Sequence, residues 1–370
     1  MSEIRVLMVV PNLRVSNGVA SFAMNYYRKL DHDLIHMDFV IISDKGSPYY
    51  EEIKSNGNKI FVLPSITRNP LSHVEYCEQM IKDGHYDIIH DCVPLKSLLI
   101  MTSAKKYRVP VRILHSHSAK LGETNGKEKL SKMFIPFLRR TATDYFACSG
   151  EAAEALFPGK KYTFIPNVID SKKFQYDANK RKRIRREMNA VNKVIVATVG
   201  RPSYQKNPIF ALNVMSEVIR QNPNVEYWWI GSGAMDDDLR HGVSERHIED
   251  NVRLLGSRDD IVDLYQTIDI FFLPSRFEGL PVTGIEAQAM GLPSVISNTI
   301  TKEMAYTDLV EYVPLDAPIE TWIEAIEKQI NRIPERRSYT KELENSVFSI
   351  ENAGYRLESL YEEKLKQARK

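Results

Sequence analysis

The chain has 370 residues, of which 43% are hydrophobic and 26% are charged, and its formal net charge is +2. This length suits two α/β domains better than a single core. The composition excludes collagen-like and low-complexity classes, and the nearly balanced charge excludes the strongly basic face of a nucleic-acid-binding protein. We therefore expect a globular protein with no nucleic-acid partner.

The first half of the chain alternates short apolar strands with helical stretches. A first helix is predicted over 19–30, and strands are predicted over 4–10, 37–42, 59–63, 86–91, 111–117 and 144–149. Near-continuous apolar strands that are separated by helices are typical of a parallel sheet covered on both faces. The first half therefore predicts a Rossmann-like α/β domain.

The second half repeats this architecture. Strands are predicted over 193–200, 225–231, 251–256, 268–274 and 293–297. The segment IPNVIDSKKF (165–174) separates the two series, and an amphipathic helix over 353–370 ends the chain. We predict one domain over 1–168, which the final helix completes, and a second domain over 169–352.

The cysteine count and the hydropathy of the chain indicate the cellular compartment in which the protein works. Cys77, Cys92 and Cys148 form no CxxC pair and no metal-ligand spacing. A sparse, odd count is typical of a reducing compartment, and no apolar run reaches the length of a membrane-spanning helix. We expect a cytoplasmic protein whose membrane contact, where it occurs, is peripheral and on the inner face.

Ligands of open α/β sheets bind outside the carboxyl ends of the strands. One of the loops selected by this rule lies in the segment 274–297, where seven residues separate Glu278 from Glu286. The first precedes a predicted helix and the second lies on it, so both carboxylates can accept hydrogen bonds from hydroxyl pairs. The alternative is that Glu278 caps the helix and Glu286 is solvated.

The residues between these carboxylates also favour a binding site. The backbone amides of Gly279 and Leu280, just before Pro281, lie at a helix N-terminus, where free N–H groups favour anions and sugar hydroxyls. Arg201 and Lys206 follow another buried strand within one loop and can neutralise a diphosphate. The alternative for these two cations is that both are solvated loop charges.

The segment 274–297 resembles the E-x7-E signature of family 4 glycosyltransferases, which are retaining enzymes of the GT-B fold. Four further segments resemble elements of the same family: SNGVASFAMNYY (16–27), IPNVID (165–170), GRPSYQKNP (200–208) and the run 256–281. The resemblance covers essentially the whole chain. It is closest to the branch that builds capsule and exopolysaccharide repeat units.

The resemblance implies two Rossmann-like domains that face a central cleft, with the acceptor on the first domain and a nucleotide sugar on the second. It implies that Arg201 and Lys206 hold the donor diphosphate, that Glu278 and the adjacent amides hold the donor sugar, and that Glu286 holds the ribose. The loop with Gly256, Ser257 and Arg258 would lie beside the base, with uridine as the default. Such a site requires no metal and no other cofactor.

Two segments in the first half complete the predicted site. Asn17 and Gly18 end the first loop, where many relatives have two glycines. Glycine allows a ligand to approach the backbone closely, whereas Asn17 or Ser16 would cap the helix, and both roles can coexist. His115 and His117 lie at a strand end, and the resemblance implies that a histidine here contacts the donor sugar. We favour His117, with His115 second, over a metal site, because no third ligand is evident.

The stretch 120–140 combines basic with apolar residues: Lys127, Lys129, Lys132, Arg139 and Arg140 with Leu130, Met133, Phe134, Ile135, Phe137 and Leu138. It could lie on an anionic membrane surface, or it could be an ordinary helix whose apolar side enters the core. These two interpretations stay open.

Together these features predict a retaining hexosyltransferase. It would move a hexose from a nucleotide sugar, most simply a UDP-sugar, to a hydroxyl of a glycan or lipid-linked acceptor in surface polysaccharide synthesis. One alternative is a nucleotide-sugar epimerase of the same architecture. Another is a catalytically silent sugar-nucleotide-binding subunit.

Overall fold

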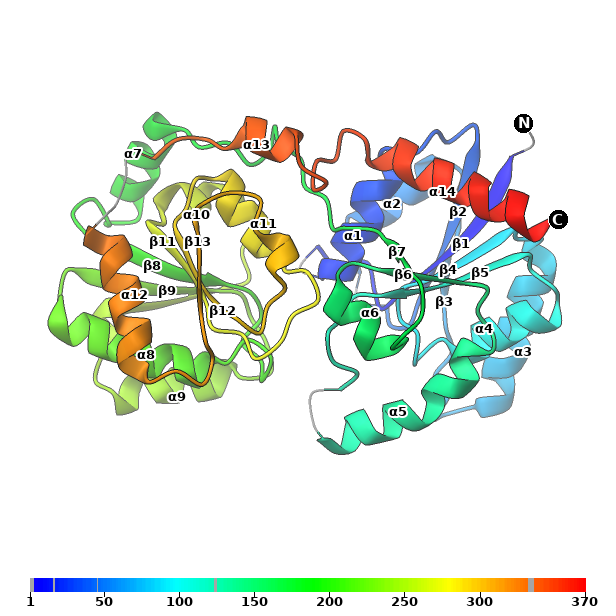
Figure 1. Ribbon diagram of the computed structural model, residues 1–370, viewed down its shortest axis with the longest axis horizontal. Helices are drawn as coiled ribbons and strands as arrows, with labels where there is room; N and C mark the ends of the chain where they lie inside the picture. The colour runs from blue at the N-terminus through cyan, green and yellow to red at the C-terminus, as the bar shows by residue number, and fades with distance from the viewer. Residues whose placement is uncertain (1–2, 16, 45, 123–124, 332–335) are drawn as a thin grey trace. The chain divides into compact units, whose positions relative to one another are not determined.

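The computed structural model describes residues 3–15, 17–44, 46–122, 125–331 and 336–370. The chain forms two compact units (Figure 1). Unit 1 comprises Met1–Val168 and Ile350–Lys370, and unit 2 comprises Ile169–Ser349. Unit 1 therefore contains both the beginning and the end of the chain.

Unit 1 contains a sheet of parallel strands in the order β3-β2-β1-β4-β5-β6-β7. The strands are β1 (Ile4–Val10), β2 (Ile35–Ile41), β3 (Ile60–Val62), β4 (Ile88–Asp91), β5 (Val111–Ser116), β6 (Asp144–Ala147) and β7 (Thr163–Phe164). The helices are α1 (Gly18–Tyr27), α2 (Tyr49–Ser55), α3 (Pro70–Gly84), α4 (Leu98–Lys106), α5 (Asn125–Arg139), α6 (Gly150–Leu156) and α14 (Ala353–Ala368).

Unit 2 contains a second parallel sheet, in the order β10-β9-β8-β11-β12-β13. Its strands are β8 (Val194–Val199), β9 (Val225–Ile230), β10 (Val252–Gly256), β11 (Ile270–Leu273), β12 (Ser294–Ser297) and β13 (Val310–Val313). The helices are α7 (Ala178–Glu187), α8 (Pro208–Gln221), α9 (Asp236–Glu245), α10 (Ile261–Thr267), α11 (Val282–Ala289), α12 (Ile319–Asn331) and α13 (Thr340–Glu344), with short 3-10 turns at Glu249–Asn251 and Lys302–Met304.

The prediction of an α/β fold with two parallel sheets is confirmed. Strands β7 and β13 were not predicted. β7 has only two residues, and β13 is an edge strand whose VEYV sequence is mostly half-buried, so neither shows the continuous apolar run of a central strand.

The order of the strands decides which loops lie side by side. In both sheets the strand order reverses after the first three strands: β4 lies on the other side of β1 from β2, and β11 lies on the other side of β8 from β9. In doubly wound sheets ligands bind at such a reversal, outside the carboxyl ends of the two strands. In unit 2 this position belongs to the loops that follow β8 and β11.

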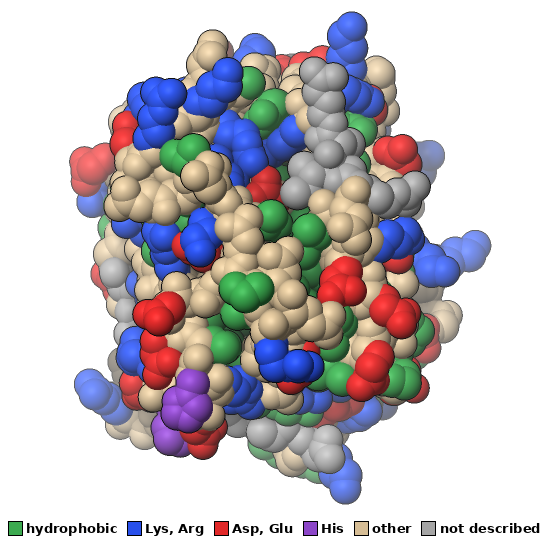
Figure 2. Space-filling view, turned by 90° about the vertical axis from the view of Figure 1, so that its left-hand side faces the viewer, with side chains coloured by type: hydrophobic (Ala, Val, Ile, Leu, Met, Phe, Trp, Pro, Cys, Tyr) green, Lys and Arg blue, Asp and Glu red, His purple; other side chains and the backbone are tan. Residues whose placement is uncertain are grey.

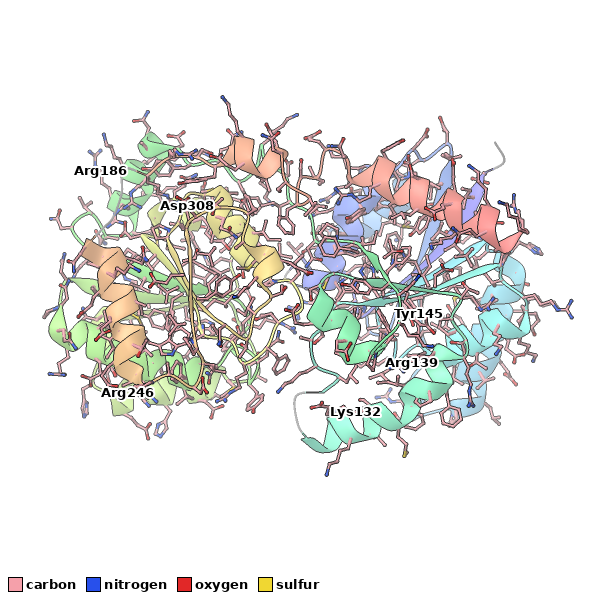
Figure 3. The ribbon with its side chains drawn as sticks, viewed as in Figure 1. Lys132, Arg139, Tyr145, Arg186, Arg246 and Asp308 are labelled. Atoms are coloured by element: carbon pink, nitrogen blue, oxygen red, sulfur yellow. The ribbon has the colours of Figure 1, made fainter. Side chains whose placement is uncertain are left out.

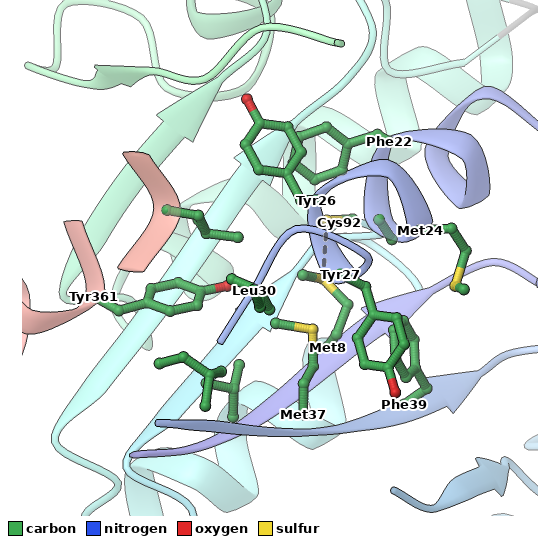
Figure 4. Packing of buried hydrophobic residues seen from close by; sticks show 14 of the residues in the cluster. Met8, Phe22, Met24, Tyr26, Tyr27, Leu30, Met37, Phe39, Cys92 and Tyr361 are labelled. Carbon is green, nitrogen blue, oxygen red and sulfur yellow. Dashed lines mark hydrogen bonds between the residues drawn. The ribbon is translucent and has the colours of Figure 1, made fainter. Parts of the chain in front are cut away.

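Helix α14 completes the core of unit 1. Its Leu357, Tyr361 and Leu365 are buried in the same cluster as the aromatic residues of α1, and Figure 4 shows Tyr361 reaching into this cluster. The contact between the two helical segments is close at Gly354, where an added Cβ would lie 1.7 Å from the Lys29 carbonyl oxygen. Only glycine fits at this position without a backbone shift.

The exterior of unit 2 carries both signs of charge. Figure 2 looks onto the side of the molecule that carries α7, α8, α9 and α12, where basic and acidic side chains are interspersed. In the described ranges, none of the helices is both long enough and apolar enough to cross a bilayer.

Candidate donor-binding site

Three glycines shape the carboxyl edge of the sheet in unit 2. Gly200 and Gly231 follow β8 and β9 at φ angles of 148° and 141°, a region that favours glycine. The amide of Gly231 donates to the carbonyl of Gly256, and a Cβ at Gly231 would lie 2.3 Å from the Gly200 oxygen. The backbones after β8 and β9 can therefore meet at this edge only because Gly231 has no side chain.

Glu278 contacts residues of two loops at this edge of the sheet. Its Oε1 lies 2.7 Å from Lys206 Nζ and accepts a hydrogen bond of 2.8 Å from the Ser275 hydroxyl, while its Oε2 accepts from Gln205 Nε2 at 2.7 Å. Glu278 is only 6% exposed. The carboxylate thus ties the loop after β8 to the loop after β11, at the reversal of the sheet.

The two predicted diphosphate ligands differ in their surroundings. The Lys206 side chain is 13% exposed and forms the ion pair with Glu278, so it is not the solvated loop charge of the alternative interpretation. Arg201 is exposed, and it forms no ion pair with a carboxylate in the described part of the chain. Lys206 is therefore held in place, whereas Arg201 is exposed to solvent.

The residues after Glu278 lead into α11. Gly279, Leu280 and Pro281 are buried, and α11 begins at Val282. On this helix, Glu286 is half-buried and accepts a hydrogen bond of 2.9 Å from the Tyr265 hydroxyl. Burial raises the pKa of Glu286 to about 7, against the opposing effects of Tyr265 and Lys173. Glu286 is thus a held carboxylate that titrates near neutral pH.

The loop after β10 is more open. Gly256 has a φ angle of 63°, and the Ser257 amide donates to the Ser232 hydroxyl at 3.1 Å. Arg258 is exposed and forms an ion pair with Asp260. The structure therefore leaves backbone groups, rather than a free cation, as the main feature of this loop.

The first predicted loop of unit 1 ends in a helix cap. The Asn17 side chain accepts hydrogen bonds from the amides of Val19 and Ala20, so Asn17 caps α1. Ser16, the other predicted cap, lies outside the described residues. Gly18 is exposed, and a Cβ there would meet no atom within 4 Å. Packing within the described structure therefore does not require glycine at this position.

The two predicted histidines are adjacent. β5 ends at Ser116, between fully buried His115 and half-buried His117, and their ring centroids lie 3.9 Å apart. Phe22 from α1 contacts both rings. Burial lowers the pKa of His117 to about 3 and that of His115 well below its usual value, so both imidazoles are neutral at physiological pH.

A third histidine was not predicted. His90, at the end of β4, is fully buried, and its Nε2 lies 2.9 Å from His115 Nδ1. Ligand atoms of His90, Cys92 and His115 lie within 4.8 Å of one another. However, both nitrogens of His90 are engaged, because Nδ1 lies 2.7 Å from the Tyr361 hydroxyl. We interpret these histidines as a hydrogen-bonded group rather than as a metal site.

Comparison with known proteins identifies the family. Residues 180–344 match the group 1 glycosyl transferases. The putative glycosyltransferase EpsF of Bacillus subtilis is 31% identical over 355 residues, which cover 92% of this chain and 91% of EpsF. The chain belongs to the group 1 glycosyltransferases.

A further relative and a solved structure of similar fold differ more from this glycosyltransferase. A UDP-Gal:α-D-GlcNAc-diphosphoundecaprenol α-1,3-galactosyltransferase of Escherichia coli is 25% identical over 298 residues, or 76% of each chain. The crystal structure of Anabaena HepE in complex with UDP has a TM-score of 0.76 at 15% identity and covers 98% of this chain and all of that one, which shows a shared GT-B fold. The epimerase and silent-subunit alternatives are not favoured by these matches.

Helix α5 of the glycosyltransferase lies within the stretch 120–140, for which a membrane-surface helix and an ordinary core-packed helix were both predicted. Ile135 and Leu138 enter the core, but four apolar side chains are 41–61% exposed at helical spacing: Leu130, Met133, Phe134 and Phe137. Lys132 forms an ion pair with Glu128, and Arg139 donates to the carbonyl of Leu156 (Figure 3). Residues 123–124 and the side chain of Lys127 lie outside the described part. One side of the helix therefore enters the core, as the second interpretation expects, and the other side exposes apolar residues, where membrane contact stays a prediction.

The Glu278–Lys206 pair predicts a measurable energetic coupling. We expect Lys206→Met and Glu278→Gln each to lower the free energy of unfolding of unit 2, by about 3 kcal/mol, because each leaves a buried polar partner unpaired. The double variant should lose less than the sum, with a coupling energy of about 1–3 kcal/mol in urea denaturation.

The pair of Lys328 and Glu311 provides the matched control. Its separation of 2.8 Å is close to the 2.7 Å of the Lys206–Glu278 pair in the same unit, but its side chains are 49% and 28% exposed. Its coupling energy should stay below about 1 kcal/mol. Additive single effects at Lys206 and Glu278 would contradict the structural role of their ion pair.

Proposed function

We propose that this glycosyltransferase transfers a hexose from a UDP-sugar to a hydroxyl of a lipid-linked glycan acceptor, with retention of the anomeric configuration, in surface polysaccharide synthesis. Unit 2 would bind the nucleotide sugar and unit 1 the acceptor. The observation that carries this proposal is the buried Lys206–Glu278 pair at the reversal of the sheet in unit 2.

Lys206 and Glu278 have unused hydrogen-bonding positions that a nucleotide sugar could occupy. An ammonium group has three N–H donors, and one suffices for Glu278, so two remain for diphosphate oxygens. The two carboxylate oxygens offer about four acceptor positions, of which Lys206, Ser275 and Gln205 use three. The fourth can accept from a sugar hydroxyl. A lysine held in advance stabilises the charge that grows on the leaving diphosphate without having to reorganise.

The other predicted residues would surround the same donor. Arg201 would pair with the diphosphate, and the amides before α11 would bind the sugar through Gly279 and Leu280. Glu286 would accept from the ribose, and His117 of unit 1 would contact the sugar. The backbone of Gly256, Ser257 and Arg258 would bind the uracil edge, and Gly18, after the cap Asn17, would let the donor approach α1.

The choice of donor and acceptor is supported by relatives. The name of the Escherichia coli relative includes a UDP-sugar donor and a diphosphoundecaprenol-linked acceptor, and HepE was crystallised with UDP. A relative of Staphylococcus aureus, 24% identical over 297 residues, is a capsular polysaccharide biosynthesis glycosyltransferase. Each of these properties is proposed here for the present chain.

Retention favours transfer on one face of the sugar. A double displacement needs a carboxylate nucleophile, and a buried candidate in unit 1 is Asp91. Asp91 is bonded to the Ser97 hydroxyl and accepts from the Val93 amide, so it closes its own turn. We therefore propose that the leaving phosphate helps to deprotonate the acceptor hydroxyl, with no covalent intermediate and no metal.

The test is a transfer assay with UDP-glucose, UDP-galactose and UDP-N-acetylglucosamine and a short-chain analogue of a diphospholipid-linked sugar. We expect one donor to give free UDP and a glycoside whose anomeric NMR coupling matches that of the donor. An inverted anomer would overturn retention. An isomeric nucleotide sugar formed without acceptor would overturn transfer itself.

Glu286 predicts a pH dependence of donor binding. Because its pKa is about 7, its carboxylate is mostly ionised at pH 8 and mostly protonated at pH 6, where it loses acceptor capacity. The Kd for UDP, measured by calorimetry, should rise about ten-fold from pH 8 to pH 6. Glu286→Gln should bind UDP more weakly at pH 8, with a flatter profile. Glu217→Gln on the surface of α8 is the control and should keep the parent profile.

We further propose that α5 binds an anionic membrane surface. Its four exposed apolar side chains occupy one face, and exposed Lys129, Lys132 and Arg140 lie among them. Such a face suits an interfacial helix, and a lipid-linked acceptor would place the enzyme at that surface. The basic side chains would add an attraction that salt screens.

Vesicle sedimentation tests this surface. We expect binding to phosphatidylglycerol–phosphatidylcholine vesicles but not to phosphatidylcholine alone, and weaker binding at high salt. Met133→Ser with Phe137→Ser should weaken binding more than ten-fold, since each buried apolar side chain contributes about 1.5–3 kcal/mol. Leu71→Ser with Tyr355→Ser removes two other exposed apolar side chains and should have no effect. Equal binding by both double variants would exclude α5.

A further inference from the structure

A buried hydrogen-bonded chain joins the C-terminal helix to the predicted sugar-contacting histidine. Tyr361 of α14 bonds to His90 Nδ1, and His90 Nε2 bonds to His115 Nδ1. The ring of His115 then packs in a tilted arrangement against that of His117, at a centroid distance of 3.9 Å and an interplanar angle of 32°. Tyr361, His90 and His115 are each fully buried, so water does not compete for these bonds.

The protonation states of these buried groups determine which atom donates in each hydrogen bond. Burial raises the pKa of the Tyr361 phenol well above its usual value and lowers that of His90 to about 3, so both groups are neutral. Among the described residues, His90 Nδ1 is the acceptor available to the phenol proton. If Tyr361 donates, His90 carries its proton on Nε2 and donates to His115 Nδ1. The proton of His115 then lies on Nε2.

Aromatic rings surround this chain. Phe22 packs edge-on against His115 and also contacts His117, while Phe146 packs edge-on against His90 and His115. The buried Nε2 of His115 has no hydrogen-bond partner in the described structure, and the backbone of Ile165 lies near this imidazole. The buried Nε2 of His117 also has no hydrogen-bond partner within the described structure. A buried polar atom without a partner is unfavourable, so a ligand hydroxyl that reached this nitrogen would gain a hydrogen bond.

We propose that Tyr361 and His90 are positioning residues for His117: the phenol fixes the tautomer of His90, His90 fixes the tautomer and ring of His115, and the His115 ring supports the imidazole of His117 against the donor sugar. This proposal rests on the proposed role of His117 in sugar transfer. Neither Tyr361 nor His90 would touch the substrate. Their effect would be on the orientation of a neutral imidazole, for which small displacements change rates strongly.

The test is Tyr361→Phe, which removes one hydroxyl and keeps the ring in the core. Without the phenol, His90 can hold its proton on either nitrogen, so His115 loses its single tautomer. We expect nitrogen-15 NMR of the imidazoles to show one tautomer for His90 and His115 in the parent and a mixture in the variant. In the transfer assay we expect kcat to fall about ten-fold while KM for the UDP-sugar changes less than two-fold.

Tyr27→Phe is the matched control. Tyr27 is also fully buried in the core of unit 1, and its hydroxyl accepts from Asn56 and Asn58 instead of bonding to a histidine. This variant should lose a similar amount of stability in urea denaturation, but it should keep the parent tautomers and kcat. A merely structural role for Tyr361 would make the two variants alike.

The outcomes separate this inference from the proposed function. If the parent transfers sugar and Tyr361→Phe keeps a kcat within two-fold of the parent, the positioning role is overturned. If the parent transfers no sugar to any acceptor, the proposed function fails, and the NMR experiment still decides whether Tyr361 sets the histidine tautomers. Unchanged tautomers in Tyr361→Phe would overturn the inference in either case.

Discussion

The carboxylate of Glu278 connects the two loops on which the site of unit 2 depends. A buried carboxylate is unfavourable unless charge and hydrogen bonds compensate it, and here Lys206, Gln205 and Ser275 do so together. Gly200 leaves room for the Lys206 side chain, and Gly231 lets the loop after β9 approach the Gly200 backbone. That one contact holds Lys206 in place and fixes the loop after β8 against the loop after β11.

The two units hold their buried polar groups by different means. Unit 2 balances opposite charges at its carboxyl edge, whereas unit 1 keeps a group of imidazoles neutral and links them to a phenol. Burial moves the pKa of His117 to about 3 and that of Glu286 to about 7. The same physical effect therefore keeps His117 uncharged and lets Glu286 change charge near neutrality, so the two groups will respond to acid in different pH ranges.

Local sequence patterns predicted the fold well, because buried parallel strands such as IRVLMVV are continuous apolar runs. They also selected Lys206 and Glu278 individually as candidate site residues. They could not predict that these residues pair, since this depends on β8 lying beside β11, and strand order is not a local property. His90 was missed for the same reason. Its proximity to His115 depends on β4 lying beside β5, and the loop after β4 was not among the predicted ligand-binding loops. For α5, spacing indicated an amphipathic helix but not which apolar residues enter the core.

The helix α14 belongs to unit 1, although all of unit 2 precedes it in the chain. Its apolar residues and Tyr361 are therefore the last components of the unit 1 core to leave the ribosome. Until then, the first sheet lacks part of its cover, and the histidine group lacks the phenol that orders its protons. The sequence of unit 2 is complete before that of unit 1, so synthesis itself determines that the N-terminal unit is the second to acquire its full core.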